Sequence, residues 1–407
     1  MQTRHISYII VLSIILSCFS SPALAILDST FTRSRQPRQG LFLYQVLEST
    51  TPTPYPKHEE QIETDTHNYY KYSEHFRIIV GKEYGNYEPT TSLMDSCLEH
   101  GEFVYEKIVS EMGYRPPRNS AQYYIDMYIG NRRARNYYSN STVYIDDMYA
   151  GYADEYGTSA QAFFVLNPVI PRYLVKVVLA HEFFHTVQFA YKSINDFRNS
   201  DFWFLEATAV FMEEMVYPEV NDYLTFIEEW YNSSHRAIDT FNSSHEYGEV
   251  IFALYLEYRF GQDFIQTIIE DFETSDHVLD ILDDRLVTDE GTSLNEVFEG
   301  FMEATMEPES YFDDGEEFLS INYRNINDYT NISYELYGPR YFFVSGSSCT
   351  VFSDEDMLDS FLVTGESYID LLDFYDPYYR YVINVLSEDS RIGTACSRRR
   401  AMIYLQE

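Results

Sequence analysis

The stretch LAHEFFHTVQF occupies residues 179 to 189 and contains the pattern H-E-x-x-H at His181, Glu182 and His185. In an α-helix, residues four apart lie on one face, one turn apart, so the two imidazoles would project side by side. Imidazole nitrogens at that spacing supply two ligands to one metal ion, and they suit Zn²⁺ at about 2.0–2.1 Å. Glu182 follows the first histidine, where its carboxylate can act as a general base on water at an open coordination position. The stretch therefore predicts a helix that carries a zinc site.

A hydrolytic zinc site needs a third protein ligand, and the next helical stretch offers one. WFLEATAVFMEEMVY, residues 203 to 217, places Glu206 among apolar residues. A carboxylate buried there without a cation would be costly. The segment between His185 and Glu206 is long enough for the first helix to end and the chain to return. We therefore expect His181, His185 and Glu206 to hold one Zn²⁺ and to leave its fourth position open.

The two stretches together resemble the gluzincin branch of the zinc metallopeptidases. They are most similar to a group of secreted bacterial metalloproteases that share HEFFHxVQ, WFxExTAxxMExxVY and a following N-D-Y, here residues 221 to 223. The similarity extends more loosely over most of residues 73 to 345. It implies a zinc-dependent endopeptidase that hydrolyses the peptide bonds of extracellular proteins or peptides.

The resemblance also implies roles for residues outside the ligand set. The thermolysin type has an aspartate four residues after the third ligand, where this chain has Val210. We therefore expect Glu213, on the same helical face as Glu206, to orient a ligand histidine instead. In the gluzincin arrangement, the last strand before the metal helix forms the edge of the cleft and pairs with an extended substrate. That strand would be formed here by Ala162, Phe163, Phe164 and Val165.

A hydrogen-bond donor is also expected where the oxyanion forms after water attacks a carbonyl. Tyr247 begins the helical stretch YGEVIFALYLEYRFG, and a tyrosine at the head of a similar helix has this role in the aminopeptidase relatives. His245 and His235 are alternatives, and a further alternative is that none of the three contacts substrate.

The chain opens with features of a secretory signal peptide. Arg4 and His5 precede an apolar run over residues 6–19, and Ala23-Leu24-Ala25 forms a cleavage site of small residues. We expect cleavage near Ala25 and a secreted, extracytoplasmic protein with no membrane span in the mature chain. The alternative of a lipoprotein acylated at Cys18 requires a small residue two positions earlier, where the sequence has Leu16.

The formal charge of −37 repels polyanions and excludes nucleic acid as a partner. It also argues against anionic membrane surfaces, and we expect a monomer. The acidic loops FDDGEE (312–317) and SDEDMLD (353–359) contain ligand types for Ca²⁺, but no D-x-D-x-D-G loop occurs and solvated loops are the simpler interpretation. After removal of the signal peptide three cysteines remain, and we expect a disulfide between Cys349 and Cys396 with Cys97 free.

The pattern of elements predicts an α+β fold in two domains. Residues 26–72 are rich in Ser, Thr and Pro and are interpreted as a low-structure tail, linker or pro-segment. Strands at FRIIVG, YYIDMYIG and AFFVLN, followed by helices, predict a mixed sheet and a zincin-like catalytic domain over residues 73–310. Short β-rich runs separated by turns predict a small β-sandwich over residues 311–407.

Two other functions are compatible with the same residues. The first is a catalytically idle extracellular binding protein on a zincin scaffold, although such a protein has no need to keep Glu182 and Glu206 as carboxylates. The second is an aminopeptidase-like exopeptidase, which needs an acidic anchor for the substrate amino terminus. No loop of the G-x-M-E-N type precedes HEFFH.

Overall fold

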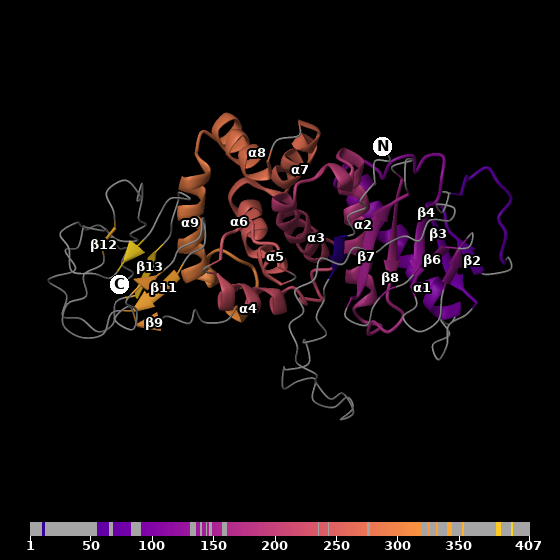
Figure 1. The fold of residues 1–407 in the computed structure, drawn as a ribbon, viewed down its shortest axis with the longest axis horizontal. Coiled ribbons are helices and arrows are strands. Elements are labelled where there is room, and N and C mark those ends of the chain that lie inside the picture. The colour runs from indigo at the N-terminus through magenta and orange to yellow at the C-terminus, as the bar shows by residue number, and fades with distance from the viewer. Residues whose placement is uncertain are drawn as a thin grey trace, which may run out of the picture. The chain divides into compact units, whose positions relative to one another are not determined.

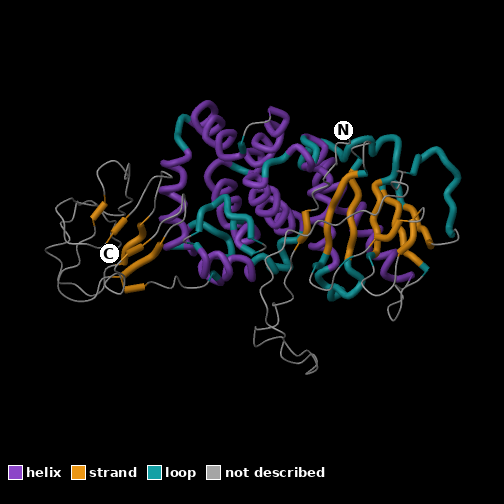
Figure 2. Tube along the Cα trace, in the orientation of Figure 1, coloured by secondary structure: helices purple, strands orange, loops and turns teal. Residues whose placement is uncertain are grey.

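The structure of the protein is a computed structural model, shown by secondary structure in Figure 2. It describes residues 10–12, 55–64, 68–82, 91–130, 136–138, 141–143, 145, 149–156, 161–234, 236–242, 244–274, 277–318, 324–325, 331–332, 340–343, 352–353, 380–383 and 392–393.

The chain divides into two compact units. Unit 1 consists of residues 1–223 and 265–276, and unit 2 consists of residues 224–264 and 277–407. This division differs from the expected boundary between residues 310 and 311, because the helices that follow Tyr223 pack with one another. Unit 1 contains the whole H-E-x-x-H stretch and Glu206.

The centre of unit 1 is a mixed sheet in the order β7-β8-β4-β3-β2, with β1 added beside β7 (Figure 1). The strands are β1 (Ile10–Leu12), β2 (Asn68–Tyr72), β3 (Phe76–Gly81), β4 (Ile125–Ile129), β7 (Gly151–Glu155) and β8 (Ala162–Leu166). β3, β4 and β8 run parallel, whereas β2 and β7 run antiparallel to their neighbours. The sheet and the helices together confirm the α+β class. A separate hairpin joins β5 (Asn136–Tyr138) and β6 (Ser141–Val143).

The sheet is buried on both faces, which is why its central strands consist of almost uninterrupted apolar residues. One face packs against α1 (Thr91–Tyr105), which continues as the π-helical turn η3 (Glu106–Glu111), and against α2 (Val175–Tyr191). The other face carries an apolar cluster that includes Tyr128, Val165 and Ile145. Alternation along β8 separates the two faces, since Phe164 contacts the ring of Phe76 while Val165 joins the cluster.

The expected low-structure tail was set too long at its carboxyl end. β2, within that segment, forms the edge of the sheet beside β3. Tyr55 also belongs to the fold, because its carbonyl accepts a hydrogen bond from the backbone N–H of Tyr124 at 3.0 Å and its ring lies under the guanidinium of Arg77. Alternating residues in NYYKY can pair as a strand despite their polarity, and this pairing was not readable from composition. Residues 26–54 lie outside the described residues.

β1 lies within the segment expected to be a signal peptide. It pairs antiparallel with β7, with Val11 opposite Tyr152. Cleavage near Ala25 would remove this strand and leave β7 as the edge of the sheet.

Unit 2 begins with a group of short helices. They are α4 (Leu224–Ser233), α5 (His245–Gly248), α6 (Val250–Phe260), α8 (Val278–Arg285) and α9 (Leu294–Met306), while α7 (Gln262–Glu270) crosses the boundary into unit 1. Their core is aromatic, with the rings of Phe252 and Phe301 5.1 Å apart and those of Trp230 and Phe301 5.5 Å apart.

Short strands follow, in two three-stranded sheets with the orders β10-β14-β12 and β13-β11-β9. They are β9 (Arg324–Asn325), β10 (Asn331–Ile332), β11 (Arg340–Phe343), β12 (Phe352–Ser353), β13 (Arg380–Ile383) and β14 (Ile392–Gly393). Most of the expected β-sandwich, with Cys349 and Cys396, lies outside the described residues, whereas Cys97 is a free and buried thiol. Across the part of the chain that is described, no helix is both long and apolar enough to span a bilayer.

Candidate metal centre

Helix α2 places the polar H-E-x-x-H side chains inside the core of unit 1. Every residue of α2 except Lys176 is buried. A helix that is apolar around its whole circumference packs in a core rather than on a surface, so the few polar side chains it carries are held away from water. The carboxyl end of α2 is held by cations, since the guanidinium groups of Arg115 and Arg118 donate to the carbonyl of Ala190 at 3.4 and 3.3 Å.

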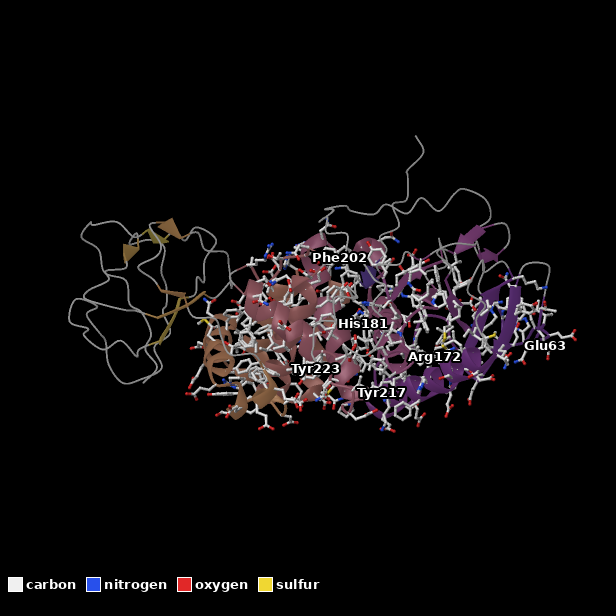
Figure 3. All side chains as sticks on the ribbon, turned by 90° about the horizontal axis from the view of Figure 1, so that it is seen from below. Glu63, Arg172, His181, Phe202, Tyr217 and Tyr223 are labelled. Atoms are coloured by element: carbon white, nitrogen blue, oxygen red, sulfur yellow. The ribbon has the colours of Figure 1, made fainter. Side chains whose placement is uncertain are left out.

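Helix α3 (Phe202–Val216) packs against α2 and carries both glutamates expected at the site. Glu206 and Glu213 are seven residues apart, which is two helical turns, so they lie on one face of α3. Both carboxyl groups point toward His181, whose position is labelled in Figure 3.

The expected ligand atoms converge on one point. His181 Nε2 and His185 Nε2 lie 3.1 and 3.4 Å from Glu206 Oε2, and the two nitrogens are 3.1 Å apart. Ligand atoms around a tetrahedral zinc ion at about 2.0–2.1 Å lie about 3.3–3.4 Å from one another. A search of the described residues for three His, Cys, Asp or Glu side chains close enough to share one metal ion finds this same set. The spacing fits zinc.

The second nitrogen of each histidine has its own partner. His181 Nδ1 lies 2.6 Å from Glu213 Oε1, which is the contact expected for Glu213, and His185 Nδ1 lies 2.7 Å from Gln188 Oε1. When both Nδ1 atoms donate a hydrogen, both Nε2 lone pairs face the Glu206 carboxylate. The two Nε2 atoms and the Glu206 carboxylate oxygen then all present lone pairs to one point with no hydrogen between them. A metal cation bound at that point would accept all three lone pairs.

The charge states favour metal binding. Burial lowers the pKa of His181 to about 4, so its imidazole is neutral and can act as a ligand. Burial opposes a charge on Glu206, but the closeness of His185 and then of His181 holds its pKa below the ordinary value. Burial, and then the negative charge of Asp222, raise the pKa of Glu213 well above its usual range.

Glu182 differs from the ligands in its surroundings. Its side chain is fully buried, and among the described residues neither carboxylate oxygen has a hydrogen-bond partner. Burial, and then the charge of Glu206, raise the pKa of Glu182 well above its usual range. A raised pKa makes the carboxylate of Glu182 a stronger base than that of an ordinary glutamate, which suits the role of general base.

Strand β7 lies directly against Glu182. A Cβ atom placed on Gly151 would lie 2.5 Å from Glu182 Oε1, so only glycine allows this approach.

The expectation that Ala162 to Val165 form the edge strand is wrong. β8 is hydrogen-bonded to β4 on one side and to β7 on the other, and β7 is the strand beside the edge. The error arose because the order of strands in a sheet does not follow their order in the chain.

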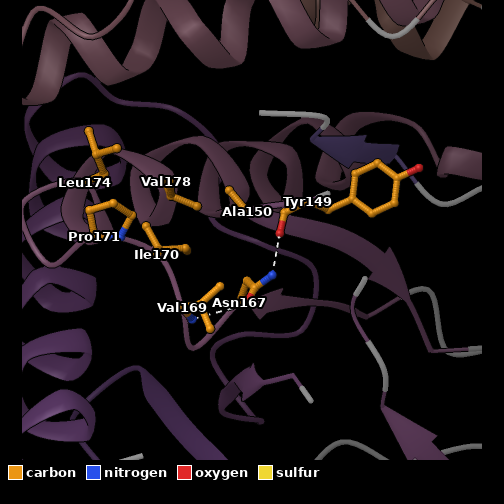
Figure 4. Close-up of a pocket in the computed structure, with 8 residues that line it drawn as sticks. All are labelled: Tyr149, Ala150, Asn167, Val169, Ile170, Pro171, Leu174 and Val178. Carbon is orange, nitrogen blue, oxygen red and sulfur yellow. Dashed lines mark hydrogen bonds between the residues drawn. The ribbon is translucent and has the colours of Figure 1, made fainter. Parts of the chain in front are cut away.

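A small apolar pocket is lined by the start of α2 and by residues just before β7 and just after β8 (Figure 4). Val178, one turn before Glu182 on α2, lines it, and so does Ala150, which directly precedes Gly151. The remaining lining residues are Tyr149, Asn167, Val169, Ile170, Pro171 and Leu174. The amide of Asn167 donates to the carbonyl of Tyr149 at 2.7 Å and so connects the two sides of the pocket.

The expected oxyanion donor belongs to unit 2. Tyr247 is buried in α5, where its ring packs 5.5 Å from that of Phe226, and its role stays a prediction. The alternative His245 is also buried, with Nδ1 3.0 Å from Ser233 Oγ and Nε2 2.8 Å from Glu249 Oε1. His235 lies outside the described residues.

Sequence reasoning missed three residues around the centre. Gln188 was present in HEFFHxVQ and lies three residues after His185, a spacing that predicts contact on a helix. Asp222 was present in the N-D-Y stretch, and it lies close enough to Glu213 to hydrogen-bond with it. Gly151 had no local signal, because its closeness to Glu182 arises from the packing of a strand on a helix.

The fold and the site together define an α+β protein with a buried His-His-Glu centre. Residues 46–303, more than half of the chain, match the model of a family described as a family of unknown function (DUF6055). The chain therefore belongs to that family. No curated protein matches it.

Proposed function

We propose that this protein is a zinc-dependent metallopeptidase that hydrolyses peptide bonds in extracellular proteins or peptides. The observation that carries the proposal is the convergence of His181, His185 and Glu206, with the buried carboxyl group of Glu182 close enough to Glu206 for their charges to interact. Three ligands that leave one position open are typical of catalytic zinc sites, whereas structural sites are closed by four protein ligands.

Two roles are assigned to different residues: some would bind the zinc ion, and one would transfer a proton. His181, His185 and Glu206 would hold zinc, and Glu213 would orient His181. Bound zinc polarises a substrate carbonyl and lowers the pKa of water. Glu182, which is not a ligand, would take the proton from the attacking water and pass it to the leaving amine.

The position of β7 supports a mode of substrate recognition. Its free edge, once β1 is removed, offers backbone groups next to Glu182, and an extended peptide can pair with such an edge. The small apolar pocket lined by Val178 and Ala150 suits, by the character of its lining, a small apolar group of the substrate.

The same proposal includes the finer features of the fold. The mixed sheet with α2 and α3 would be a zincin-like domain of the gluzincin type, and residues 311–407 would be an accessory β-sandwich. The protein would be secreted after cleavage near Ala25 and would act as a monomer. Ca²⁺ has no support from the described residues.

One observation favours a second candidate function. The side chains of His181, Glu182, His185 and Glu206 are all fully buried. A substrate must reach zinc, whereas a structural ion need not be accessible. An extracellular binding protein that holds zinc and cleaves nothing would explain this burial, because no substrate has to reach its ion.

Zinc content and proteolysis separate these candidates. Purified wild-type protein should hold about one zinc ion per chain and should cleave a denatured protein in a chelator-sensitive manner. Glu182→Gln should keep its zinc and lose at least about a hundredfold in cleavage rate, because general-base contributions are typically of this size. Glu102→Gln is a control, since Glu102 is a partly buried glutamate of α1 in the same unit whose carboxylate contacts His75.

Three outcomes would contradict parts of the proposal. Folded protein without stoichiometric zinc would show that the site is wrongly assigned. Zinc-loaded wild type that cleaves no substrate would favour the idle binding protein. Equal rates for wild type and Glu182→Gln would show that another group is the base.

A further inference from the structure

Gln188 lies at the meeting point of the two helices that carry the metal ligands. It is on α2, three residues after His185, and its side chain is fully buried. Burying an amide without hydrogen-bond partners would cost folding free energy, so the partners of the Gln188 amide indicate its structural role. All three of its contacts involve residues of the candidate metal centre or their neighbours in sequence.

The contacts fix which way the amide points. Gln188 Nε2 lies 2.9 Å from the carbonyl oxygen of Leu205 and 2.9 Å from Thr208 Oγ1. The carbonyl can only accept. The Thr208 hydroxyl donates to the carbonyl of Phe204 at 2.6 Å, so its lone pairs face Gln188. The atom near these two acceptors must therefore be the NH₂ group, and Oε1 must be the atom 2.7 Å from His185 Nδ1.

This orientation determines the tautomer of His185. An amide oxygen can only accept a hydrogen bond, so His185 carries its hydrogen on Nδ1. The lone pair of the neutral imidazole is then on Nε2, the atom that points toward Glu206 and His181. The hydrogen bond to Gln188 thus leaves His185 Nε2 free of hydrogen, as a metal ligand must be, and it fixes the orientation of the imidazole ring.

The same amide also connects α2 to α3. Leu205 directly precedes Glu206, and Thr208 follows it by two residues. By donating to the backbone carbonyl of Leu205 and to the side-chain hydroxyl of Thr208, Gln188 holds α3 on either side of the third ligand against the helix that carries the other two. One side chain therefore acts on ligands from both helices.

We propose that Gln188 is a positioning residue for the metal centre, which sets the tautomer of His185 and the separation of Glu206 from the two histidines. The inference rests on the proposed function in that it takes the bound ion to be zinc. It makes the two histidines unequal, because His181 has a carboxyl group as its partner and His185 has a neutral amide.

Zinc affinity, measured by competition with a chromophoric chelator, tests the proposal without any activity assay. Gln188→Met keeps the volume but removes all three hydrogen bonds, and it should weaken zinc binding about 10–100-fold, the usual loss when such a partner is removed. Gln161→Met is the matched control, because Gln161 is a buried glutamine of the same unit that donates to the carbonyl of Tyr124. The control variant should bind zinc like the wild type.

Gln188→Glu separates the two roles. It keeps an oxygen opposite His185 Nδ1, so it should lose clearly less zinc affinity than Gln188→Met. An equal loss in both variants would overturn the role in positioning His185. An equal loss in Gln188→Met and Gln161→Met would overturn the proposal as a whole, since any buried glutamine would then serve. Unchanged zinc affinity in Gln188→Met would also overturn the proposal as a whole.

A measurement on the wild type covers the case in which a variant does not fold. Nitrogen NMR of the histidine-labelled, metal-free full-length chain at neutral pH should show His185 with its hydrogen on Nδ1. A hydrogen on Nε2 would overturn the inference. Failure of the wild type to bind zinc at all would instead overturn the proposed function, so the two results are distinguishable.

Discussion

Gly151→Ala should impair catalysis while leaving the zinc in place. The added Cβ would lie 2.5 Å from Glu182 Oε1, 2.7 Å from its Cγ and 2.8 Å from its Cδ. Non-bonded heavy atoms prefer separations of about 3.5–4.0 Å, so the two groups must move apart by about 1 Å. β7 is held along its length by its ladder with β8, so we expect the carboxylate of Glu182 to move.

The displacement sets the size of the effect. A misplacement of about 1 Å at a reacting group can cost about a hundredfold in rate, and overpacking costs about 1–3 kcal/mol of stability. Glu182 is not among the three converging ligands, so zinc affinity should stay near the wild-type value. We expect kcat/KM on a denatured protein substrate to fall about a hundredfold, with one zinc ion still bound.

Gly130→Ala is the matched control for strain in the same sheet. Its added Cβ would lie 2.4 Å from Ile145 Cγ2, within the apolar cluster on the face away from α2. Gly130→Ala should lose about as much free energy of unfolding as Gly151→Ala. Its kcat/KM should stay at the wild-type value when it is assayed well below its melting temperature. Wild-type kcat/KM in zinc-loaded Gly151→Ala would refute the reasoning, and so would an equal loss of rate in the control.

Two further predictions concern the charged groups of the centre. Glu206→Ala should abolish stoichiometric zinc binding, measured by elemental analysis of dialysed protein, because it removes one of three ligands; retained zinc would show that the third ligand is elsewhere. Glu182→Gln should stabilise the metal-free protein increasingly as pH rises. The pKa of Glu182 is raised on folding, so its contribution to stability is fully present below about pH 4.5 and is lost as pH rises through the raised value. Urea unfolding of chelator-treated proteins should therefore show no difference at pH 4.5 and a gain of about 1–3 kcal/mol at high pH, the cost of a buried polar group without a partner. A gain that shrinks with rising pH would contradict this reasoning.

The sequence determined those features of the centre that depend on short separations along a helix. His181 and His185 are one turn apart, so their convergence needs only that α2 be a helix. Glu206 and Glu213 are two turns apart on α3, and Glu213 was chosen because the resemblance to the thermolysin type implies an acidic residue near the third ligand and position 210 holds valine. The contact of Glu213 with His181 then required only that the two helices pack together. The strands β3, β4 and β8 were also readable, because FRIIVG, YYIDMYIG and AFFVLN are runs rich in β-branched and aromatic residues, which favour strands.

Only the tertiary structure decided what depends on contacts between distant segments. The order of strands made β7, and not β8, the strand beside the edge, because pairing partners are chosen by packing rather than by position in the chain. β2 joined the sheet through hydrogen bonds to β3 that its polar composition did not indicate. The close approach of Gly151 to Glu182 requires a strand and a helix to be packed in register. The orientation of the Gln188 amide requires acceptors from α3, since oxygen and nitrogen of an isolated glutamine side chain are interchangeable. Local periodicity thus specifies which side chains share a helix face, whereas the partners that set their tautomer, charge and position come from segments that only folding brings together.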